Sequence, residues 1–249
     1  MIPIRDNVPR VTLPVAVTVI ILLNAAIFLY SLGLDPRSLA HLFHVHGVVP
    51  ARFFEPSWAM GAGYPETLGW PLVSYMFLHG GWVHVILNMW MLWIFGDNIE
   101  DVTGHSGFVI FYLLCGLAAV GLQMLFGQSS SVPIIGASGA VAGVMGAYIM
   151  LYPHGRVLTL VPILFIPLFL RIPAGLFLAV WFLSQLVAGL ISSAEGAQNV
   201  AWWAHVGGFV AGSGLIHWFR RPGRCRYCYN PTTKDYDPEL DDAPELDDE

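Results

Sequence analysis

The hydrophobic positions of the chain fall into long apolar stretches, separated by short segments rich in polar residues, glycine or proline. An apolar stretch of roughly 20 residues is typical of a membrane-spanning helix, because such a helix matches the thickness of the hydrocarbon core. From the N-terminus, the expected spans are 13–34, 82–95 or slightly beyond, 107–126, 138–152, 174–191 and 202–219. The pattern therefore predicts an all-α polytopic membrane protein built as a bundle of six transmembrane helices.

Two apolar segments do not fit a span. Residues 35–80 contain five prolines together with several aromatic residues and a few charges, so we expect a long interfacial loop between the first two spans. The segment 157–170 contains Pro162 and Pro167. As a helix it would reach only about 21 Å, short of a hydrocarbon core of about 30 Å. We expect it to be a re-entrant or interfacial element that does not cross the membrane.

The charges support this topology. Only 11% of the residues are charged, against about 25% in a soluble domain. With six spans and both termini on one side, nine of the 11 basic residues lie on that side, and only Arg37 and Arg52 lie on the other. An excess of basic residues marks the cytoplasmic side, so the sequence predicts that both termini are cytoplasmic.

The chain is expected to divide into a short cytoplasmic N-terminus (1–12), a six-span core (13–219) and a cytoplasmic tail (220–249). Nine of the 17 acidic residues lie in 235–249, so we expect a solvated, disordered tail. Nothing indicates a nucleic-acid partner or a cofactor. Cys225 and Cys228 are expected to be free thiols in a reducing cytoplasm. The lack of a large extra domain favours a bacterial plasma (inner) membrane.

Four polar residues stand out within the apolar bundle, where ionisable groups are costly and usually functional. His84 and Asn88 lie four residues apart and share one face of the second span. Ser138 opens the fourth span, and His205 lies one turn into the sixth. These three spans enter the membrane from the same outer side, so the four residues are expected at similar depth.

The chemistry of these residues indicates nucleophilic catalysis. A serine hydroxyl needs a base, which a neutral histidine supplies, so we predict a dyad of Ser138 and His205. No carboxylate lies in a position to complete a triad. The oxyanion of an acyl-transfer reaction needs fixed donors, which the N-terminus of the fourth span and the Asn88 amide could supply, with His84 as a further candidate.

Small residues indicate close packing around the dyad. Gly139 and Gly143 form a small-xxx-small pair on the fourth span, and Gly208 and Gly212 follow His205 on the sixth. Small residues on facing helices let their backbones approach closely. This packing would bring the imidazole of His205 within reach of Ser138.

Together these motifs resemble the three hallmark motifs of rhomboid proteases. The motifs are Gly136-Ala137-Ser138-Gly139, His84-x-x-x-Asn88, and Ala204-His205 followed by Gly208 and Gly212. The resemblance covers roughly 13–219. It implies that Ser138 is the nucleophile, that His205 is the base, and that His84 and Asn88 lie on the oxyanion side, next to Gly136.

The resemblance also implies a substrate class and a bracing residue. Rhomboids are intramembrane serine endopeptidases that cleave transmembrane segments near the outer face, so single-span or polytopic membrane proteins would be the substrates. His79 resembles a position that braces the outer loop. The sequence departs from some relatives at Ala142, where they carry a tyrosine that stacks on the base, so the orientation of His205 must be set by an aromatic from elsewhere or by nothing.

Other functions are less well supported. A rhomboid-like pseudoprotease, which binds membrane helices without cleavage, would not need both dyad residues. A transporter or channel would place ionisable groups through the whole thickness of the bilayer, whereas here they gather in the outer half. The zinc and aspartyl classes of intramembrane protease need His-Glu-x-x-His or paired membrane aspartates, and the sequence has neither. We expect no metal at His41, His44 and His46, nor at the two tail cysteines.

Overall fold

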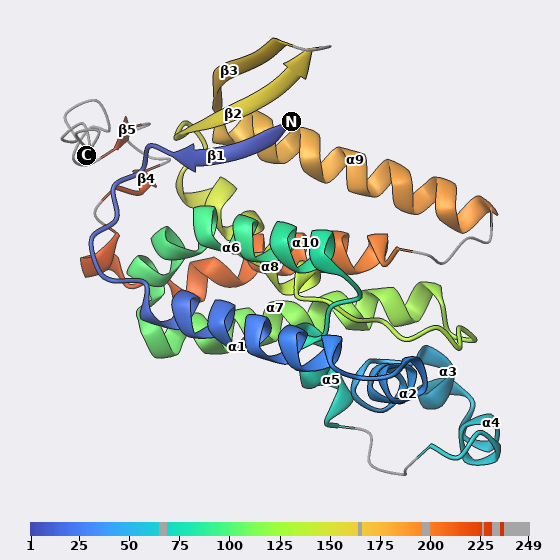
Figure 1. Ribbon diagram of the computed structural model, residues 1–249. Helices are drawn as coiled ribbons and strands as arrows, with labels where there is room; N and C mark the ends of the chain where they lie inside the picture. Colours follow the sequence, from blue (N-terminus) through green and yellow to red (C-terminus); the bar gives the residue numbers. More distant parts are fainter. Residues whose placement is uncertain (65–68, 164–165, 196–199, 226, 231–234, 237–249) are drawn as a thin grey trace.

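Helix α8 (Ser138–Leu151) lies at the centre of the molecule, and nearly all of its residues are buried. Figure 1 shows the computed structural model. It describes residues 1–64, 69–163, 166–195, 200–225, 227–230 and 235–236. Alanine and glycine make up six of the 14 residues of α8, so this slim central helix lets its neighbours approach from several sides.

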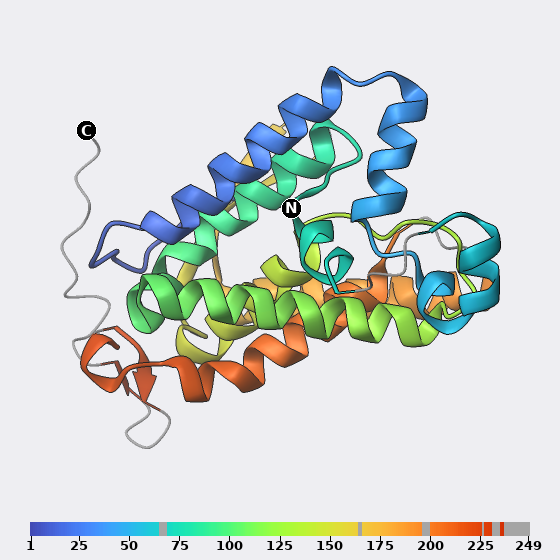
Figure 2. The same cartoon turned by 90° about the horizontal axis from the view of Figure 1, so that it is seen from below.

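Five longer helices complete the bundle, namely α1 (Val15–Leu32), α6 (Trp82–Thr103), α7 (His105–Phe126), α9 (Ala174–Glu195) and α10 (Trp202–Phe219). All of them except α1 pack directly against α8. The most extensive packing joins α10 to α8 and α7. Figure 2 shows α1 running alongside α6 on the other side of the bundle. The expected predominance of helices is therefore confirmed.

Length and composition identify fewer spans than the six predicted. Helices α1, α7 and α9 are each long and apolar enough to cross a membrane. Helix α6 would be a fourth if it counts as one broken span with the segment Pro71–Phe77, from which it is bent by 95°. Helix α8 is apolar but has only 14 residues. The described residues thus support an integral membrane protein with three or four candidate spans.

The segment between α1 and α6 folds into short helices rather than an irregular loop. They are α2 (Pro36–His46), α3 (Pro50–Phe54), α4 (Pro56–Gly61), α5 (Pro71–Ser74) and the 3-10 turn η1 (Tyr75–Phe77). Each of the four α-helices starts with a proline, which is favourable at the first helical position because that N–H has no partner in the helix. Asp35 caps α2 by accepting hydrogen bonds from the N–H groups of Arg37 and Ser38.

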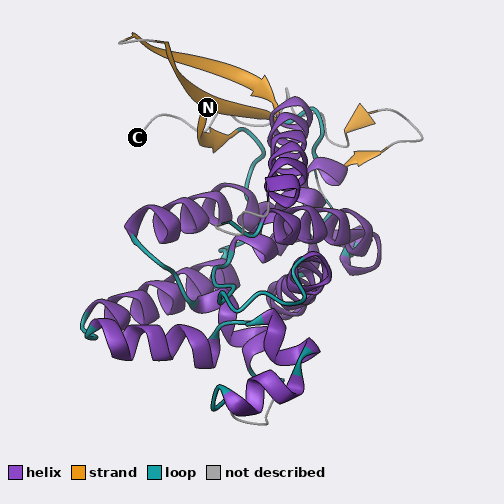
Figure 3. Ribbon diagram, turned by 90° about the vertical axis from the view of Figure 1, so that its right-hand side faces the viewer, coloured by secondary structure: helices purple, strands orange, loops and turns teal. Residues whose placement is uncertain are grey.

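A three-stranded antiparallel sheet, which the all-α prediction lacks, stands at one edge of the bundle next to α9 (Figures 1 and 3). Strands β2 (Arg156–Ile163) and β3 (Ile166–Pro173) form a hairpin, and β1 (Ile2–Asp6) pairs with the free edge of β2. Pro162 and Pro167 oppose each other in the hairpin. Two prolines would break a helix, which explains why this apolar segment is extended.

The polar end of α6 corrects a second expectation. The expected span ends at residue 95 or slightly beyond, but α6 continues to Thr103, and Glu100 and Asp101 are buried. Glu100 accepts hydrogen bonds from the N–H groups of Ala16 and Val17, at 2.8 Å each. These N–H groups lie in the first turn of α1, where they have no partner within the helix. The carboxylate satisfies them, so it can be buried.

The C-terminal residues correct a third expectation. After η2 (Pro222–Arg224), Cys225 and Cys228 form a disulfide instead of remaining free thiols. Their Cα atoms lie 5.3 Å apart, within the range that a disulfide requires. Strands β4 (Tyr229–Asn230) and β5 (Asp235–Tyr236) then pair with each other. The rest of the acidic tail, for which disorder was expected, lies outside the described residues.

Candidate active site

Ser138 is the first residue of α8, and the chain reaches it through a sharp turn at Gly136. The φ angle of Gly136 is +122°, a conformation that residues with a side chain rarely adopt. A Cβ atom there would also lie 2.6 Å from Nε2 of His84, so the position requires glycine on two counts. The N–H of Gly136 donates to the carbonyl of Tyr75 at 2.9 Å. The backbone just before Ser138 is therefore fixed against α6 and the segment that precedes it.

His79 lies against this turn and is buried. The N–H of Ala137 approaches its Nε2 atom at 3.5 Å, and its ring meets the ring of His84 edge-on, with centroids 4.9 Å apart. The bracing role that the resemblance implied for His79 stays a prediction. His79 touches both the turn before α8 and the start of α6.

The glycines of α8 and α10 bring these two helices into backbone contact. A Cβ atom on Gly208 would lie 1.9 Å from the carbonyl oxygen of Gly139, and one on Gly212 would lie 1.9 Å from that of Gly143. Any side chain at either position would push the helices apart. This close approach places His205, one turn before Gly208, beside the N-terminus of α8.

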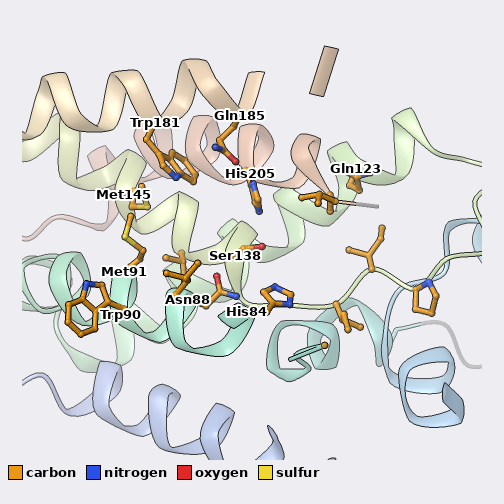
Figure 4. Close-up of a pocket in the computed structure, with 18 of the residues that line it drawn as sticks. His84, Asn88, Trp90, Met91, Gln123, Ser138, Met145, Trp181, Gln185 and His205 are labelled. Atoms are coloured by element: carbon orange, nitrogen blue, oxygen red, sulfur yellow. Dashed lines mark hydrogen bonds between the residues drawn. The ribbon is translucent and has the colours of Figure 1, made fainter. Parts of the chain in front are cut away.

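Ser138 and His205 face each other across a cavity, as Figure 4 shows. Among the hydrogen bonds of the described residues, none joins the Ser138 hydroxyl directly to the imidazole. Catalytic hydrogen bonds are often long in a structure without substrate and shorten when substrate binds. The two side chains are held on two closely packed helices, α8 and α10.

Two helices other than α8 hold the imidazole of His205. Its Nδ1 atom lies 2.8 Å from Oε1 of Gln185, which comes from α9. The rings of Trp181 and Trp202 lie beside it, each with its centroid 6.0 Å from that of the imidazole. Ala142, where some rhomboids carry a tyrosine, is fully buried and contributes no ring.

Asn88 and His84 lie on the opposite side of Ser138 from His205 (Figure 4). Asn88 is 7% exposed, and its side-chain nitrogen has no hydrogen-bond partner among the described residues. A buried donor without a partner costs stability, so its retention calls for a functional explanation. An amide donor in this position beside a serine is chemically able to bind a developing oxyanion.

The cavity has a volume of about 680 Å³ and is lined by α6, α8, α9, α10 and the first residues of the chain. Its lining includes all four polar candidates, while Met91, Met145 and Trp181 make part of the wall apolar. The residues that line it include neither Asp nor Glu. The cavity thus offers a serine, two histidines and an amide in an apolar enclosure without a carboxylate.

A family model described as the Rhomboid domain matches residues 67–222, which is more than half of the chain. The chain belongs to the rhomboid family. The family resemblance of the motifs is thereby confirmed, and the matched range contains all the residues that line the cavity except the first three and Pro50.

Several curated proteins are similar to this rhomboid over part of their length. RHOMBOID-like protein 6, mitochondrial, from Arabidopsis thaliana is 40% identical over 78 residues, which are 31% of this chain and 25% of the relative. Rhomboid protein 1, mitochondrial, from Saccharomyces cerevisiae is 27% identical over 152 residues, 59% of this chain and 41% of the relative. Presenilin-associated rhomboid-like protein, mitochondrial, from Mus musculus is 32% identical over 101 residues, 40% and 26% of the two chains. The chain thus spans between a quarter and about two fifths of the length of these relatives.

These relatives contradict the expected bacterial plasma membrane. Their names place them in mitochondria, and a further relative is Rhomboid-like protein 11, chloroplastic. They point to an organellar membrane. The inference from the lack of large extra domains was therefore wrong, because domain content does not report the compartment.

Sequence reasoning missed the contribution of α9 to the rhomboid site. Gln185 gave a signal, since it is the one long polar side chain in the expected span 174–191. Trp181 gave no such signal, because aromatic residues in an apolar helix commonly pack against other helices or face the lipid. The histidines of the first loop belong elsewhere: His44 pairs with Tyr64, and His46 accepts a hydrogen bond from Trp70.

Proposed function

We propose that this rhomboid is an intramembrane serine endopeptidase that cleaves transmembrane segments with a dyad of Ser138 and His205. The observation that carries the proposal is the cavity between them. It holds a serine at a helix N-terminus, a histidine facing it and an amide nitrogen without a hydrogen-bond partner among the described residues. This is the minimal set for acyl transfer: nucleophile, base and oxyanion donor.

The reaction follows from the placement of these groups. Nε2 of His205 removes the proton of the Ser138 hydroxyl while Oγ attacks the scissile carbonyl carbon. The oxyanion that forms accepts hydrogen bonds from the first N–H groups of α8 and from the Asn88 amide, with His84 beside them. His205 then passes its proton to the leaving amine, and an acyl-enzyme forms. Water, deprotonated by His205, hydrolyses this ester and restores the serine.

We propose a six-span arrangement for the enzyme, with α1, α6, α7, α8, α9 and α10 each crossing the membrane and both termini on one face. Helix α8 spans about 21 Å at its 14 residues, so Ser138 would lie below the surface of a hydrocarbon core of about 30 Å. The long segment between α1 and α6 would lie at the interface. The names of the relatives support an organellar membrane as the site of action.

The substrates in this proposal are single-span or polytopic membrane proteins. A transmembrane helix must unwind before a serine protease can reach its backbone, because helical carbonyls are hydrogen-bonded and shielded. The apolar walls of the cavity suit an unwound apolar segment, and Asn88 and the N-terminus of α8 can satisfy its carbonyl oxygen.

The test is to measure cleavage of a single-span substrate and labelling by a fluorophosphonate probe, with the protein in detergent. Wild type is expected to cleave and to take up one probe, and Ser138→Ala is expected to do neither, a loss of at least about 10³-fold. Ser213→Ala is the matched control, since Ser213 lies on α10 and bonds to the Gly146 carbonyl, away from the cavity. Cleavage by Ser138→Ala would contradict the dyad, and a folded wild type that neither cleaves nor labels would indicate a pseudoprotease.

A further inference from the structure

Gln185 is a long polar side chain in the middle of the mainly apolar helix α9, and its contacts belong to a directed series of hydrogen bonds. Ser184 Oγ donates its proton to the carbonyl of Trp181 at 2.6 Å. Nε2 of Gln185 donates to the same Ser184 oxygen at 2.9 Å. Oε1 of Gln185 lies 2.8 Å from Nδ1 of His205. Three consecutive bonds thus run from the backbone of α9 to the imidazole.

The direction of these hydrogen bonds determines which ring nitrogen of His205 carries the hydrogen. The Ser184 hydroxyl has already given its proton to a carbonyl, so it can only accept from Gln185. The amide nitrogen of Gln185 must therefore face Ser184, and the amide oxygen must face the histidine. An oxygen without a proton can only accept, so Nδ1 of His205 carries the hydrogen.

This protonation state is the one that the reaction needs. A neutral imidazole with hydrogen on Nδ1 has its free lone pair on Nε2, the nitrogen that must take the serine proton. The opposite tautomer would present an N–H to Ser138 and could not act as a base. In serine proteases with a triad, an acidic residue holds the tautomer in this way. Among the described residues that line this cavity, none is acidic.

We propose that Gln185 is the positioning residue of the dyad, whose side-chain carbonyl holds the Nδ1–H tautomer of His205 and turns Nε2 toward Ser138. The inference rests on the proposed protease function and deepens it. It also accounts for Ala142. A ring stacked on the imidazole restricts its position but leaves its tautomer open, whereas a carbonyl bonded to Nδ1 restricts both. The support that some rhomboids place on α8 comes here from α9.

The decisive variants are Gln185→Leu, which keeps the volume but removes the acceptor, and Gln185→Glu, which keeps an acceptor and adds charge. Ser193→Ala is the matched control. Ser193 accepts a hydrogen bond from Trp203 at 2.9 Å, so it joins the same two helices without touching His205. If Gln185 merely ties α9 to α10, the control and Gln185→Leu will behave alike.

We expect Gln185→Leu to lower kcat on the order of tenfold or more with little change in KM, because loss of one hydrogen bond acts on the base and not on substrate binding. The rate of fluorophosphonate labelling, which needs no substrate docking, is expected to fall by the same factor. Gln185→Glu is expected to retain more activity than Gln185→Leu. The acid limb of its pH–rate profile is expected to lie at higher pH than that of wild type, because a nearby negative charge favours the imidazolium.

The outcomes separate this proposal from the one on which it rests. If Ser138→Ala is inactive while Gln185→Leu labels and cleaves at the wild-type rate, the positioning role is wrong and the protease assignment stands. The positioning role is also wrong if Ser193→Ala loses as much activity as Gln185→Leu. If Gln185→Leu does not fold, the position of the acid limb in Gln185→Glu decides alone, and an unshifted limb contradicts the proposal.

Discussion

Two groups of buried polar side chains lie at opposite ends of α6, and they differ in how their hydrogen-bonding atoms are used. Near the start of the helix, Asn88 points an unpaired amide nitrogen into a cavity of about 680 Å³. Near its end, the carboxylates of Glu100 and Asp101 accept hydrogen bonds from backbone N–H groups of the N-terminal segment and α1. The side chain near the start of α6 faces the cavity, whereas the carboxylates near its end are hydrogen-bonded within the protein.

The hydrogen-bond partners of a buried polar residue indicate whether it stabilises the fold or is available to bind a ligand. Burial alone marks both groups as costly and therefore in need of an explanation. Glu100 and Asp101 act as caps, because they accept hydrogen bonds from the N–H groups at and just before the start of α1. Their burial is therefore explained by their contribution to stability. Asn88 has no such partner among the described residues, so we explain it by the oxyanion that it would bind under the proposed function.

The largest effect is expected at Glu100, whose loss should reduce stability but not chemistry. Glu100→Ala would leave the buried N–H groups of Ala16 and Val17 without acceptors, at about 1–3 kcal/mol each. We expect a loss of about 3 kcal/mol or more in the free energy of unfolding, measured by thermal or denaturant unfolding in detergent.

The control for this prediction is Glu55→Ala, because Glu55 is exposed. It is expected to change stability by no more than about 0.5 kcal/mol. The molecules of Glu100→Ala that remain folded are expected to react with a fluorophosphonate at the wild-type rate. A slowed reaction in the folded fraction would show that the two ends of α6 are coupled, and the contrast between them would then fail.

The opposite result is expected at Asn88. Asn88→Ala removes an unpaired donor, so stability is expected to stay within about 1 kcal/mol of wild type or to rise. We expect kcat to fall by about 10²–10³, the usual consequence of losing one oxyanion donor. Substrate cleavage and thermal unfolding of the same preparation measure both quantities.

A second asparagine of α6 provides the matched control. Asn98 is buried at the other end of the helix and donates from Nδ2 to the carbonyl of Val8 at 3.3 Å. Asn98→Ala is expected to lose about 1 kcal/mol of stability and no kcat. If the two variants have similar effects on kcat, Asn88 is a packing residue and the oxyanion role must be given up.

The smallest effect is expected from the ionisation of Asp6, the last residue of β1. Asp6 lies near the end of α6 that carries the buried carboxylates. Asp6 accepts a hydrogen bond from Tyr148. Burial, followed by the negative charge of Asp97, raises the pKa of Asp6 from 3.8 to about 8. The Asp6 carboxyl therefore keeps its proton to higher pH when β1 is docked on the rest of the protein than when β1 is detached. Docking is therefore strongest at low pH, weakens as the pH rises from about 4 to about 8, and levels off above that range.

Hydrogen exchange of the β1 amides measures this effect when wild type and Asp6→Asn are compared at each pH. We expect the protection in wild type to fall relative to Asp6→Asn between pH 5 and pH 8, because the asparagine cannot ionise. A ratio that is independent of pH would contradict the pKa given for Asp6. Fluorophosphonate labelling followed over the same range would show whether Met1–Pro3, which line the cavity, affect access to it.

The positions of helices α8 and α10 and the family followed from the sequence alone. The expected segments 138–152 and 202–219 agree with α8 (Ser138–Leu151) and α10 (Trp202–Phe219) to within a residue. Helix positions follow from local composition, because each apolar run ends where polar residues, glycine or proline begin. The rhomboid motifs are likewise short and contiguous, so they could be recognised without knowing how the chain folds.

Which polar residues contact one another could be seen only in the folded molecule. Asp101 binds the N–H of Val11, 90 residues away, and Gln185 binds His205 from another helix. Nothing in the local sequence of either partner marks the other. The same holds for β1, which pairs with β2 although more than half of the chain separates the two strands in the sequence. Hydrogen bonds between distant segments depend on how helices pack, and packing is a property of the assembled bundle rather than of any one apolar stretch.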